Sequence, residues 1–304
     1  MALIAGPTAS GKSDCAVELA LALQEQGKRA VVLNADSAQV YADLRVLSAR
    51  PSEEEMRGIE HRLFGSWDGA QACSAADWAD AARREITALH SEDAIPVLVG
   101  GTGMYIRTLL DGIAPIPPID PSIRETVRAM PTAEAYAALQ AEDPERAAAL
   151  DPADSQRIAR ALEVVRSTGR TLAEWQREKI GGIAQDIELH PLLLLPEREW
   201  LYERCDRRFV EMLKLGAIEE VEALLARNLS RELPVMRAIG VPEIAAMLRG
   251  ETTEEEMIAA GQQATRNYAK RQFTWFRRQP PDEWPQVETQ NYDTVTYFAS
   301  LLRH

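Results

Sequence analysis

The sequence is poor in cysteine and histidine and has no long apolar run, and each shortage excludes a class of protein. Its three cysteines, Cys15, Cys73 and Cys205, are odd in number and widely scattered, which predicts reduced thiols in a cytoplasm rather than a disulfide framework. The four histidines include no ligand-spaced pair, so no structural zinc site is expected. No apolar stretch approaches the ~20 residues of a membrane span. Because Met1 leads directly into strand-like residues, we expect no signal peptide either.

Positive charge is also in short supply. The chain has 34 lysines and arginines against 47 aspartates and glutamates, a net charge of −13 at pH 7. This balance argues against broad nonspecific affinity for nucleic acid, although a local basic patch is compatible with it. The composition, 46% hydrophobic and 27% charged, is that of an ordinary soluble globular protein. A chain of 304 residues is long enough for one large α/β domain and a smaller second domain.

The segment AGPTASGKS at residues 5–13 has the spacing of a polyphosphate-binding loop. It lies between a predicted strand at 2–5 and a helix that ends before Gly27. In that setting backbone N–H groups converge on phosphate oxygens at a helix N-terminus, Lys12 adds a charge and Ser13 can bind Mg²⁺. A glycine turn without chemistry is disfavoured, because spacing and context agree. The predicted phosphate-binding residues are Gly6, Pro7, Thr8, Ala9, Ser10, Gly11, Lys12 and Ser13.

Strand and helix patterns alternate along the first part of the chain. RAVVLN at 29–34 and AIPVLVGG at 94–101 are strand-like, with a helical pattern before the second, which indicates a parallel sheet. A proline-rich connector at 113–122 precedes a helical region, and a strand-like run at 187–195 resumes the sheet. We therefore predict a first core part at 1–118, an inserted helical domain at 119–186 and a second core part at 187–304.

Polar residues follow the second and third predicted strands, where open parallel sheets bind their ligands. Asp36 is a candidate base that accepts a proton from a nucleophile, or alternatively a cap for the next element. The strand at 94–101 has no acid where a typical NTPase holds Mg²⁺. The strand ends instead in Gly100, Gly101, Thr102 and Gly103. These glycines either let a ligand approach the backbone closely or serve only to form a tight turn.

Three further segments contain clustered arginines. TRNYAKRQFTWFRR at 265–278 has no acid, and its cations and aromatics suit an RNA backbone and unstacked bases. The alternative interpretation of the segment 265–278 is an amphipathic helix whose aromatic side chains lie in the core and whose cations are solvated. Arg157 and Arg160 share a helix face at i and i+3, which fits a phosphate-clamping lid or an RNA grip. Arg207 and Arg208 are candidates for contact with a diphosphate.

Taken together, these segments resemble the bacterial tRNA dimethylallyltransferases. The resemblance implies transfer of a dimethylallyl group from dimethylallyl diphosphate to the N6 amine of the adenosine 3′-adjacent to the tRNA anticodon. It implies an α/β fold with a P-loop kinase-like parallel sheet flanked by helices, and an inserted all-helical domain that contacts the anticodon stem. Apart from the resemblance, we expect Mg²⁺ as the cofactor, a cytoplasmic protein without a membrane partner, and a monomer, which can handle an elongated tRNA. The matching segments, in family order, are AGPTASGKS, NADSAQVY, CSAADW, LVGGTGMYIRTLLDG, DSQRIARALEV, TGRTL, RRFVEML, LPVMRAIG and TRNYAKRQFTWFRR.

The resemblance also assigns roles to residues of this chain. It implies Asp36 as the base, Thr102 at the reacting centre, Lys12 and Arg208 on the diphosphate, and Ser13 on Mg²⁺. The chain departs from the family at Val241, at Cys73 and in the segment LSARPS at 47–52, which affects details of tRNA contact rather than the reaction. The implied tRNA contacts are Asp36, Ser37, Ala38, Gln39, Thr102, Arg124, Gln156, Arg157, Ile158, Ala159, Arg160, Arg266, Lys270, Arg271 and Arg277.

Two other functions compete with this interpretation. A small-molecule or nucleotide kinase would use Asp36 to activate a hydroxyl and the Arg157–Arg160 pair to close over ATP, and the motifs without the resemblance favour it. A nucleotide-gated RNA-binding protein is disfavoured, because the third strand lacks an acid and switch motifs are not recognisable. The resemblance favours the prenyltransferase.

Overall fold

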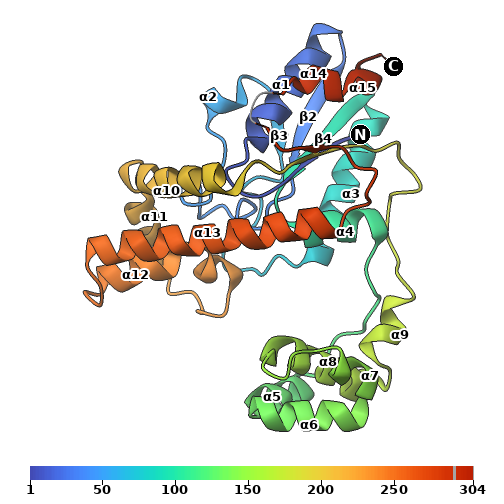
Figure 1. The fold of residues 1–304 in the computed structure, drawn as a ribbon, viewed down its shortest axis with the longest axis vertical. Helices are drawn as coiled ribbons and strands as arrows, with labels where there is room; N and C mark the ends of the chain where they lie inside the picture. Colours follow the sequence, from blue (N-terminus) through green and yellow to red (C-terminus); the bar gives the residue numbers. More distant parts are fainter. Residues whose placement is uncertain (290–291, 304) are drawn as a thin grey trace. The chain divides into compact units, whose positions relative to one another are not determined.

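The computed structural model describes residues 1–289 and 292–303 (Figure 1). Gln290, Asn291 and His304, in the predicted core part 187–304, lie outside the described residues. The chain divides into two compact units, one formed by Met1–Leu109 with Ala184–His304 and the other by Leu110–Ile183. The helical unit thus begins and ends earlier than the predicted 119–186. The reason is that its two connecting segments pair with each other through an antiparallel bridge between Ile113 and Ile180.

The first unit is built on a six-stranded sheet in the order β3-β2-β4-β1-β5-β6, in which every pair of neighbours is parallel. Parallel neighbours need crossover connections, which the helices supply. The predicted strands at 2–5, 29–34 and 94–101 are confirmed, while the run at 187–195 forms a shorter strand. The bounds are β1 Ala2–Ala5, β2 Arg29–Asn34, β3 Glu60–Arg62, β4 Ala94–Gly100, β5 His190–Leu194 and β6 Gln286–Val287.

Helices cover both faces of this sheet. Helix α1 (Lys12–Glu25) packs its buried leucines Leu19 and Leu23 into a core cluster with alternate residues of the central strands, and the C-terminal helices α14 (Thr294–Tyr297) and α15 (Ala299–Arg303) close that cluster with Phe298. Helix α3 (Ala75–Ser91) packs on β4. Its indole Trp78 is fully buried and donates a hydrogen bond to the Asn34 carbonyl oxygen at 2.9 Å, which anchors the carboxyl end of β2.

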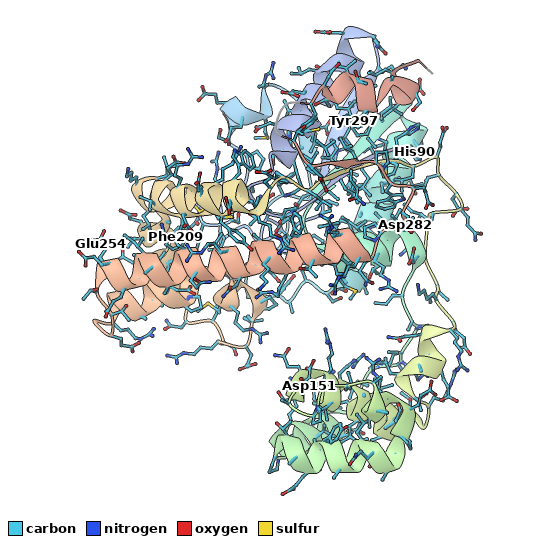
Figure 2. The ribbon with its side chains drawn as sticks, viewed as in Figure 1. His90, Asp151, Phe209, Glu254, Asp282 and Tyr297 are labelled. Carbon is cyan, nitrogen blue, oxygen red and sulfur yellow. The ribbon has the colours of Figure 1, made fainter. Side chains whose placement is uncertain are left out.

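A second helical layer lies against the carboxyl edge of the sheet. Its helices α10 (Arg198–Lys214) and α13 (Glu254–Arg278) run side by side (Figure 1). Gly261 of α13 faces the ring of Phe209 on α10, the side chain labelled between the two helices in Figure 2, so a side chain at 261 would overlap that ring. The remaining elements of this unit are α2 Glu53–Met56, α4 Gly103–Asp111, which runs into the other unit, α11 Ala217–Ala226, η1 Pro234–Arg237 and α12 Val241–Leu248.

The second unit is entirely helical. Its core joins Val127, Leu139, Ile158 and Leu162, contributed by three of its helices. The helices are α5 Pro121–Ala129, α6 Thr132–Glu142, α7 Pro144–Ala148, α8 Ser155–Thr168 and α9 Leu172–Gln176. Within residues 1–289 and 292–303, no helix is long and apolar enough to cross a bilayer.

Candidate active site

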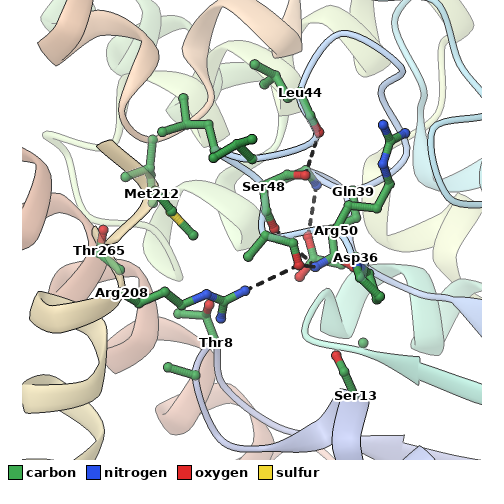
Figure 3. A pocket seen from close by; sticks show the side chains of 18 of the residues that line it. Thr8, Ser13, Asp36, Gln39, Leu44, Ser48, Arg50, Arg208, Met212 and Thr265 are labelled. Atoms are coloured by element: carbon green, nitrogen blue, oxygen red, sulfur yellow. Dashed lines mark hydrogen bonds between the residues drawn. The ribbon is translucent and has the colours of Figure 1, made fainter. Parts of the chain in front are cut away.

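A cavity of about 910 Å³ opens at the carboxyl edge of the sheet, all of it within the first unit (Figure 3). Its walls are the phosphate loop with the start of α1, the segment at 36–39 after β2, the loop at 44–52, and inward faces of α10 and α13. Parallel strands end together at one edge, so residues far apart in sequence converge there. Most of the predicted phosphate loop lines this cavity.

The phosphate loop has the backbone that a close turn requires. Gly11 caps α1 with a φ of 91°, and Ala9 takes a φ of 62°, which is uncommon for a residue with a side chain. Gly6 lies against the Leu194 carbonyl, where a Cβ would overlap the strand. Of the predicted phosphate-binding residues, those from Thr8 to Ser13 line the cavity, whereas Gly6 and Pro7 lie behind it.

Lys12 and Arg208 bring two cations to the same cavity from different elements. Burial lowers the pKa of Lys12 to about 8, partly opposed by the negative charge of Asp36, and Arg208 lowers it further. Burial is also the main cause of the lowered pKa of Arg208. Two partly desolvated cations side by side are unfavourable without an anion. The arrangement therefore suits a ligand with several negative charges, such as a diphosphate.

Two serines of the loop offer hydroxyl groups. The Ser10 Oγ atom is buried and has no hydrogen-bond partner within the described part of the chain, so it is an unused donor beside the cavity. Ser13 is exposed at the start of α1 and lines the cavity. No group of three or more histidine, cysteine, aspartate or glutamate side chains in residues 1–289 and 292–303 is arranged to hold a metal. A hydroxyl beside a phosphate site still fits Mg²⁺, which takes most of its ligands from water and phosphate oxygens.

Asp36 is fixed just beyond β2 by its neighbour Asn34. The Asn34 amide accepts the Asp36 N–H at 2.9 Å and donates to the Asp36 and Leu63 carbonyl oxygens at 3.0 and 3.1 Å. The Asp36 Oδ1 atom accepts the Ala38 N–H at 2.9 Å, so the capping role is real. Its Oδ2 atom makes no hydrogen bond with any described residue, which leaves an acceptor in the cavity wall.

Thr102 reaches the site through Ser37 rather than directly. Its Oγ1 atom accepts the Ser37 N–H at 2.9 Å and donates to the Ser37 Oγ at 3.2 Å, although Thr102 itself does not line the cavity. Tyr268, from α13, does line the cavity, and its phenol interacts with the Thr102 and Ser37 side chains. Burial, together with the charge of Asp36, raises the pKa of Tyr268, so the phenol stays neutral. Sequence reasoning did not single out Tyr268 as a site residue.

The loop at 44–52 is held by residues predicted to bind substrates. Gln39 donates its amide to the Ser48 and Ala49 carbonyl oxygens at 3.1 and 3.0 Å, and Arg208 donates to the Ala49 oxygen at 3.4 Å (Figure 3). The carboxylate of Glu220 on α11 also accepts hydrogen bonds from the backbone N–H groups of Arg45, Val46 and Leu47. The segment that departs from the family pattern is therefore firmly attached to the site.

The glycines after β4 accommodate protein rather than ligand. A Cβ at Gly100 would overlap the backbone of Ala35, one at Gly101 would overlap the amide of Gln272, and one at Gly103 would overlap the ring of Trp275. The tight-turn alternative is therefore the better description of these positions, with α13 packed directly on the turn.

The basic stretch at 265–278 combines both predicted roles, with one exception. Phe273 and Phe276 are buried, as expected for core aromatics, and Arg271 lines the cavity. Lys270 and Arg277 are exposed on α13 and do not line the cavity. The exception is Arg266, whose guanidinium is paired at 2.6 Å with both carboxylate oxygens of Asp206 on α10. This pair joins α13 to α10, and contact of Arg266 with tRNA stays a prediction.

In the helical unit, the predicted tRNA contacts lie mainly on the surface. Arg124, Gln156, Arg157 and Arg160 are exposed and Ala159 is half-buried. Ile158 is wholly buried in the core of the unit. Its side chain supports the helix instead of contacting RNA, because every third or fourth residue of α8 faces inward.

Comparison with known proteins decides the family. Residues 39–279 match the family model described as IPP transferase. The chain belongs to the IPP transferase family. Among its relatives, the tRNA dimethylallyltransferase of Erythrobacter litoralis is 66% identical over 304 residues, covering 100% of this chain and 96% of the relative. That of Rhizobium meliloti is 48% identical over 290 residues, covering 94% of each.

Solved structures of the family agree with the fold. The tRNA isopentenylpyrophosphate transferase of Bacillus halodurans superposes with a TM-score of 0.68 at 30% identity, covering 99% of this chain and 94% of that one. A eukaryotic dimethylallyltransferase acting on tRNA superposes with a TM-score of 0.77 at 27% identity, covering 91% of this chain and 69% of that one. The predicted fold class, a P-loop kinase-like parallel sheet with flanking helices, is confirmed.

Proposed function

We propose that this IPP transferase family member transfers a dimethylallyl group from dimethylallyl diphosphate to tRNA, at the N6 amine of the adenosine 3′-adjacent to the anticodon. Relatives that match 92–100% of the chain are tRNA dimethylallyltransferases. The observation that carries the proposal is the convergence of Lys12, Arg208 and Asp36 on one cavity at the phosphate loop. Two cations receive a diphosphate, and a carboxylate stands where a nucleophile must lose a proton.

The leaving group explains the cations. As the allylic C–O bond breaks, the diphosphate departs with the bonding electron pair and the dimethylallyl carbon gains carbocation character. Lys12, Arg208 and the N–H groups at the start of α1 neutralise the charge that develops on the diphosphate. The unpartnered Ser10 hydroxyl is a further donor for it. Mg²⁺ bound to diphosphate oxygens and the Ser13 hydroxyl would add to this neutralisation.

The nucleophile explains the carboxylate. An exocyclic adenine amine is weakly nucleophilic, so its placement beside the allylic carbon matters as much as a base. The N6 lone pair forms the new C–N bond as the C–O bond breaks, and the Oδ2 atom of Asp36 takes the proton that the amine then loses. Ser37 and Gln39, which line the same wall, would hold the adenine ring. The adenosine must leave its stack to enter, at a cost of a few kcal/mol.

The tRNA would be held by exposed cations of both units. On α13 these are Lys270, Arg271 and Arg277, and in the helical unit they are Arg124, Arg157 and Arg160. Their contacts with RNA phosphates offset the cost of unstacking the target base. We propose that the enzyme acts as a monomer in the cytoplasm, where its three buried free cysteines stay reduced.

Diphosphate release tests the proposal against the kinase alternative. The purified protein is incubated with Mg²⁺, dimethylallyl diphosphate and unmodified tRNA whose anticodon loop carries consecutive adenosines, beside a reaction in which ATP replaces the prenyl donor. We expect diphosphate release that requires tRNA, and no turnover of ATP. Phosphoryl transfer from ATP with an inert prenyl donor would establish the kinase instead.

A further inference from the structure

One buried amide joins the two loops on which the donor site is built. The Gln272 Oε1 atom accepts the backbone N–H of Thr8 in the phosphate loop at 2.7 Å, and its Nε2 atom donates to the Gly101 carbonyl oxygen at 2.8 Å. The side chain is 6% exposed, and its partners lie 264 and 171 residues away along the chain. Gln272 belongs to α13, so a helix from the second helical layer fixes the spacing between the phosphate loop and the turn after β4.

The surrounding packing leaves the amide a single position. A Cβ at Gly101 would overlap its Nε2 atom and come within 3.0 Å of the Gly6 carbonyl oxygen. Both polar ends of the side chain are used, and each is hydrogen-bonded to a backbone group. A buried N–H or C=O left unpaired is unfavourable, so the loop cannot drift from the turn without losing a hydrogen bond.

The bond to Thr8 also constrains the residues that would face the diphosphate. Ala9 follows Thr8 and adopts a left-handed conformation with a φ of 62°, which residues other than glycine rarely adopt. Such a conformation persists only where its surroundings impose it. The Thr8 N–H is committed to Gln272, so the amides from Ala9 to Ser13 remain for an anion.

We infer that Gln272 is a positioning residue for the prenyl donor: it holds the phosphate loop in the shape that receives the diphosphate, without touching the substrate. The inference rests on the proposed function only in naming dimethylallyl diphosphate as the ligand. It predicts weaker donor binding when the amide is lost, with much less effect on turnover once the donor is saturating.

The chain offers a matched control on the same helix. Gln262 also donates its amide to a backbone carbonyl of another element, the Asp206 oxygen on α10 at 3.2 Å, and this hydrogen bond involves neither the phosphate loop nor the turn after β4. Gln262→Met and Gln272→Met make the same chemical change. A purely structural role for Gln272 would lower the melting temperature of both variants and leave donor affinity alike in the two.

The experiment measures the dissociation constant of dimethylallyl diphosphate by calorimetry, and KM and kcat for tRNA prenylation with the donor varied. We expect Gln272→Met to raise the donor dissociation constant and KM at least tenfold, with kcat within threefold of the unaltered protein, and Gln262→Met to change donor affinity less than twofold. Equal donor affinity in the two variants would overturn the inference. Failure of the unaltered protein to bind the donor would instead count against the proposed function.

A second variant covers the case in which Gln272→Met does not fold. Gln272→Glu keeps the volume and the acceptor for the Thr8 N–H but loses the donor for the Gly101 oxygen. We expect the Thr8 amide to stay protected from hydrogen exchange while the donor dissociation constant rises severalfold. An unchanged dissociation constant would show that the link to Gly101 does not shape the donor site, and would overturn the inference.

Discussion

The ammonium group of Lys12 donates a hydrogen bond to the carbonyl oxygen of Pro7 at 2.6 Å, within the same phosphate loop. The phosphate loop therefore orients the Lys12 side chain before any ligand binds. Because burial lowers its pKa to about 8, this cation titrates near neutral pH, unlike an exposed lysine.

Donor affinity should fall as the pH rises from 7 to 9. A lysine is charged below its pKa, so the ammonium is mostly present at pH 7 and only about one tenth protonated at pH 9. We expect the dissociation constant of dimethylallyl diphosphate to rise roughly tenfold over this range, as measured by calorimetry. Lys12→Arg is the control, since a guanidinium stays charged. A flat profile in the unaltered protein would contradict this role for Lys12.

Asp36→Asn should slow prenyl transfer severely while leaving donor binding intact. The asparagine keeps an oxygen for the Ala38 N–H, so the turn after β2 survives, but it cannot take a proton from the amine. We expect single-turnover transfer to slow by about 10²- to 10⁴-fold. Asp36→Ala should have the same effect on transfer. Loss of donor binding in the asparagine variant would mean that Asp36 is structural.

Arg277 and Arg278 should contribute to tRNA binding in a salt-dependent way. Both are exposed at the end of α13, where Arg277 lies 3.5 Å from Glu288. If each contacts a phosphate, alanine at either position should lower the slope of log affinity against log salt by about 0.7 to 0.9. The readout is filter binding over a salt series, with donor affinity unaffected. Arg29→Ala removes an arginine paired with Glu60 and Glu92, and serves as the control. If the slope of log affinity against log salt in both variants equals that of the unaltered protein, Arg277 and Arg278 do not contact tRNA phosphates.

Gly261→Ala should destabilise the first unit. Helix propensity favours alanine by about 1 kcal/mol, but the added Cβ overlaps the buried ring of Phe209. Overpacking of this kind costs about 1 to 3 kcal/mol, so we expect a net loss of stability, measured by chemical unfolding. Phe209→Leu in the same chain should recover part of the loss, because the two residues share one contact. A stabilised Gly261→Ala protein would show that α10 and α13 are less tightly packed.

Much of the fold could be predicted because its signals are local. The strand at 2–5 and the glycine loop after it are a short apolar run followed by a recognisable spacing, and the structure places both as expected. Strand β3 was missed because its three residues, Glu60–Arg62, are polar and pair only along one edge of β2. The boundary at Leu110 was missed because it depends on the bridge between Ile113 and Ile180, which no local pattern indicates.

The candidate site was predictable to a similar extent. Asp36 was predicted from its place at the end of a strand and Lys12 from the spacing of the phosphate loop, and both line the same cavity. Tyr268 and Gln272 lie four residues apart on one face of α13. The cations of this stretch led to a prediction of RNA binding, so these two residues were not predicted to belong to the donor site. Their spacing suggests a buried face, but only the fold reveals that this face packs on the phosphate loop and on the turn at Gly101. Likewise, nothing in the local sequence pairs Arg266 with Asp206.

The central claim is that the phosphate loop holds a prenyl donor whose hydrocarbon group ends on tRNA. The most direct measurement supplies dimethylallyl diphosphate labelled in the prenyl carbons, digests the tRNA after reaction and identifies the labelled nucleoside by mass spectrometry. The account predicts label on N6 of the adenosine 3′-adjacent to the anticodon, lost in Asp36→Asn. Unlabelled tRNA from a protein that binds the donor, or a phosphate group transferred from ATP, would contradict it.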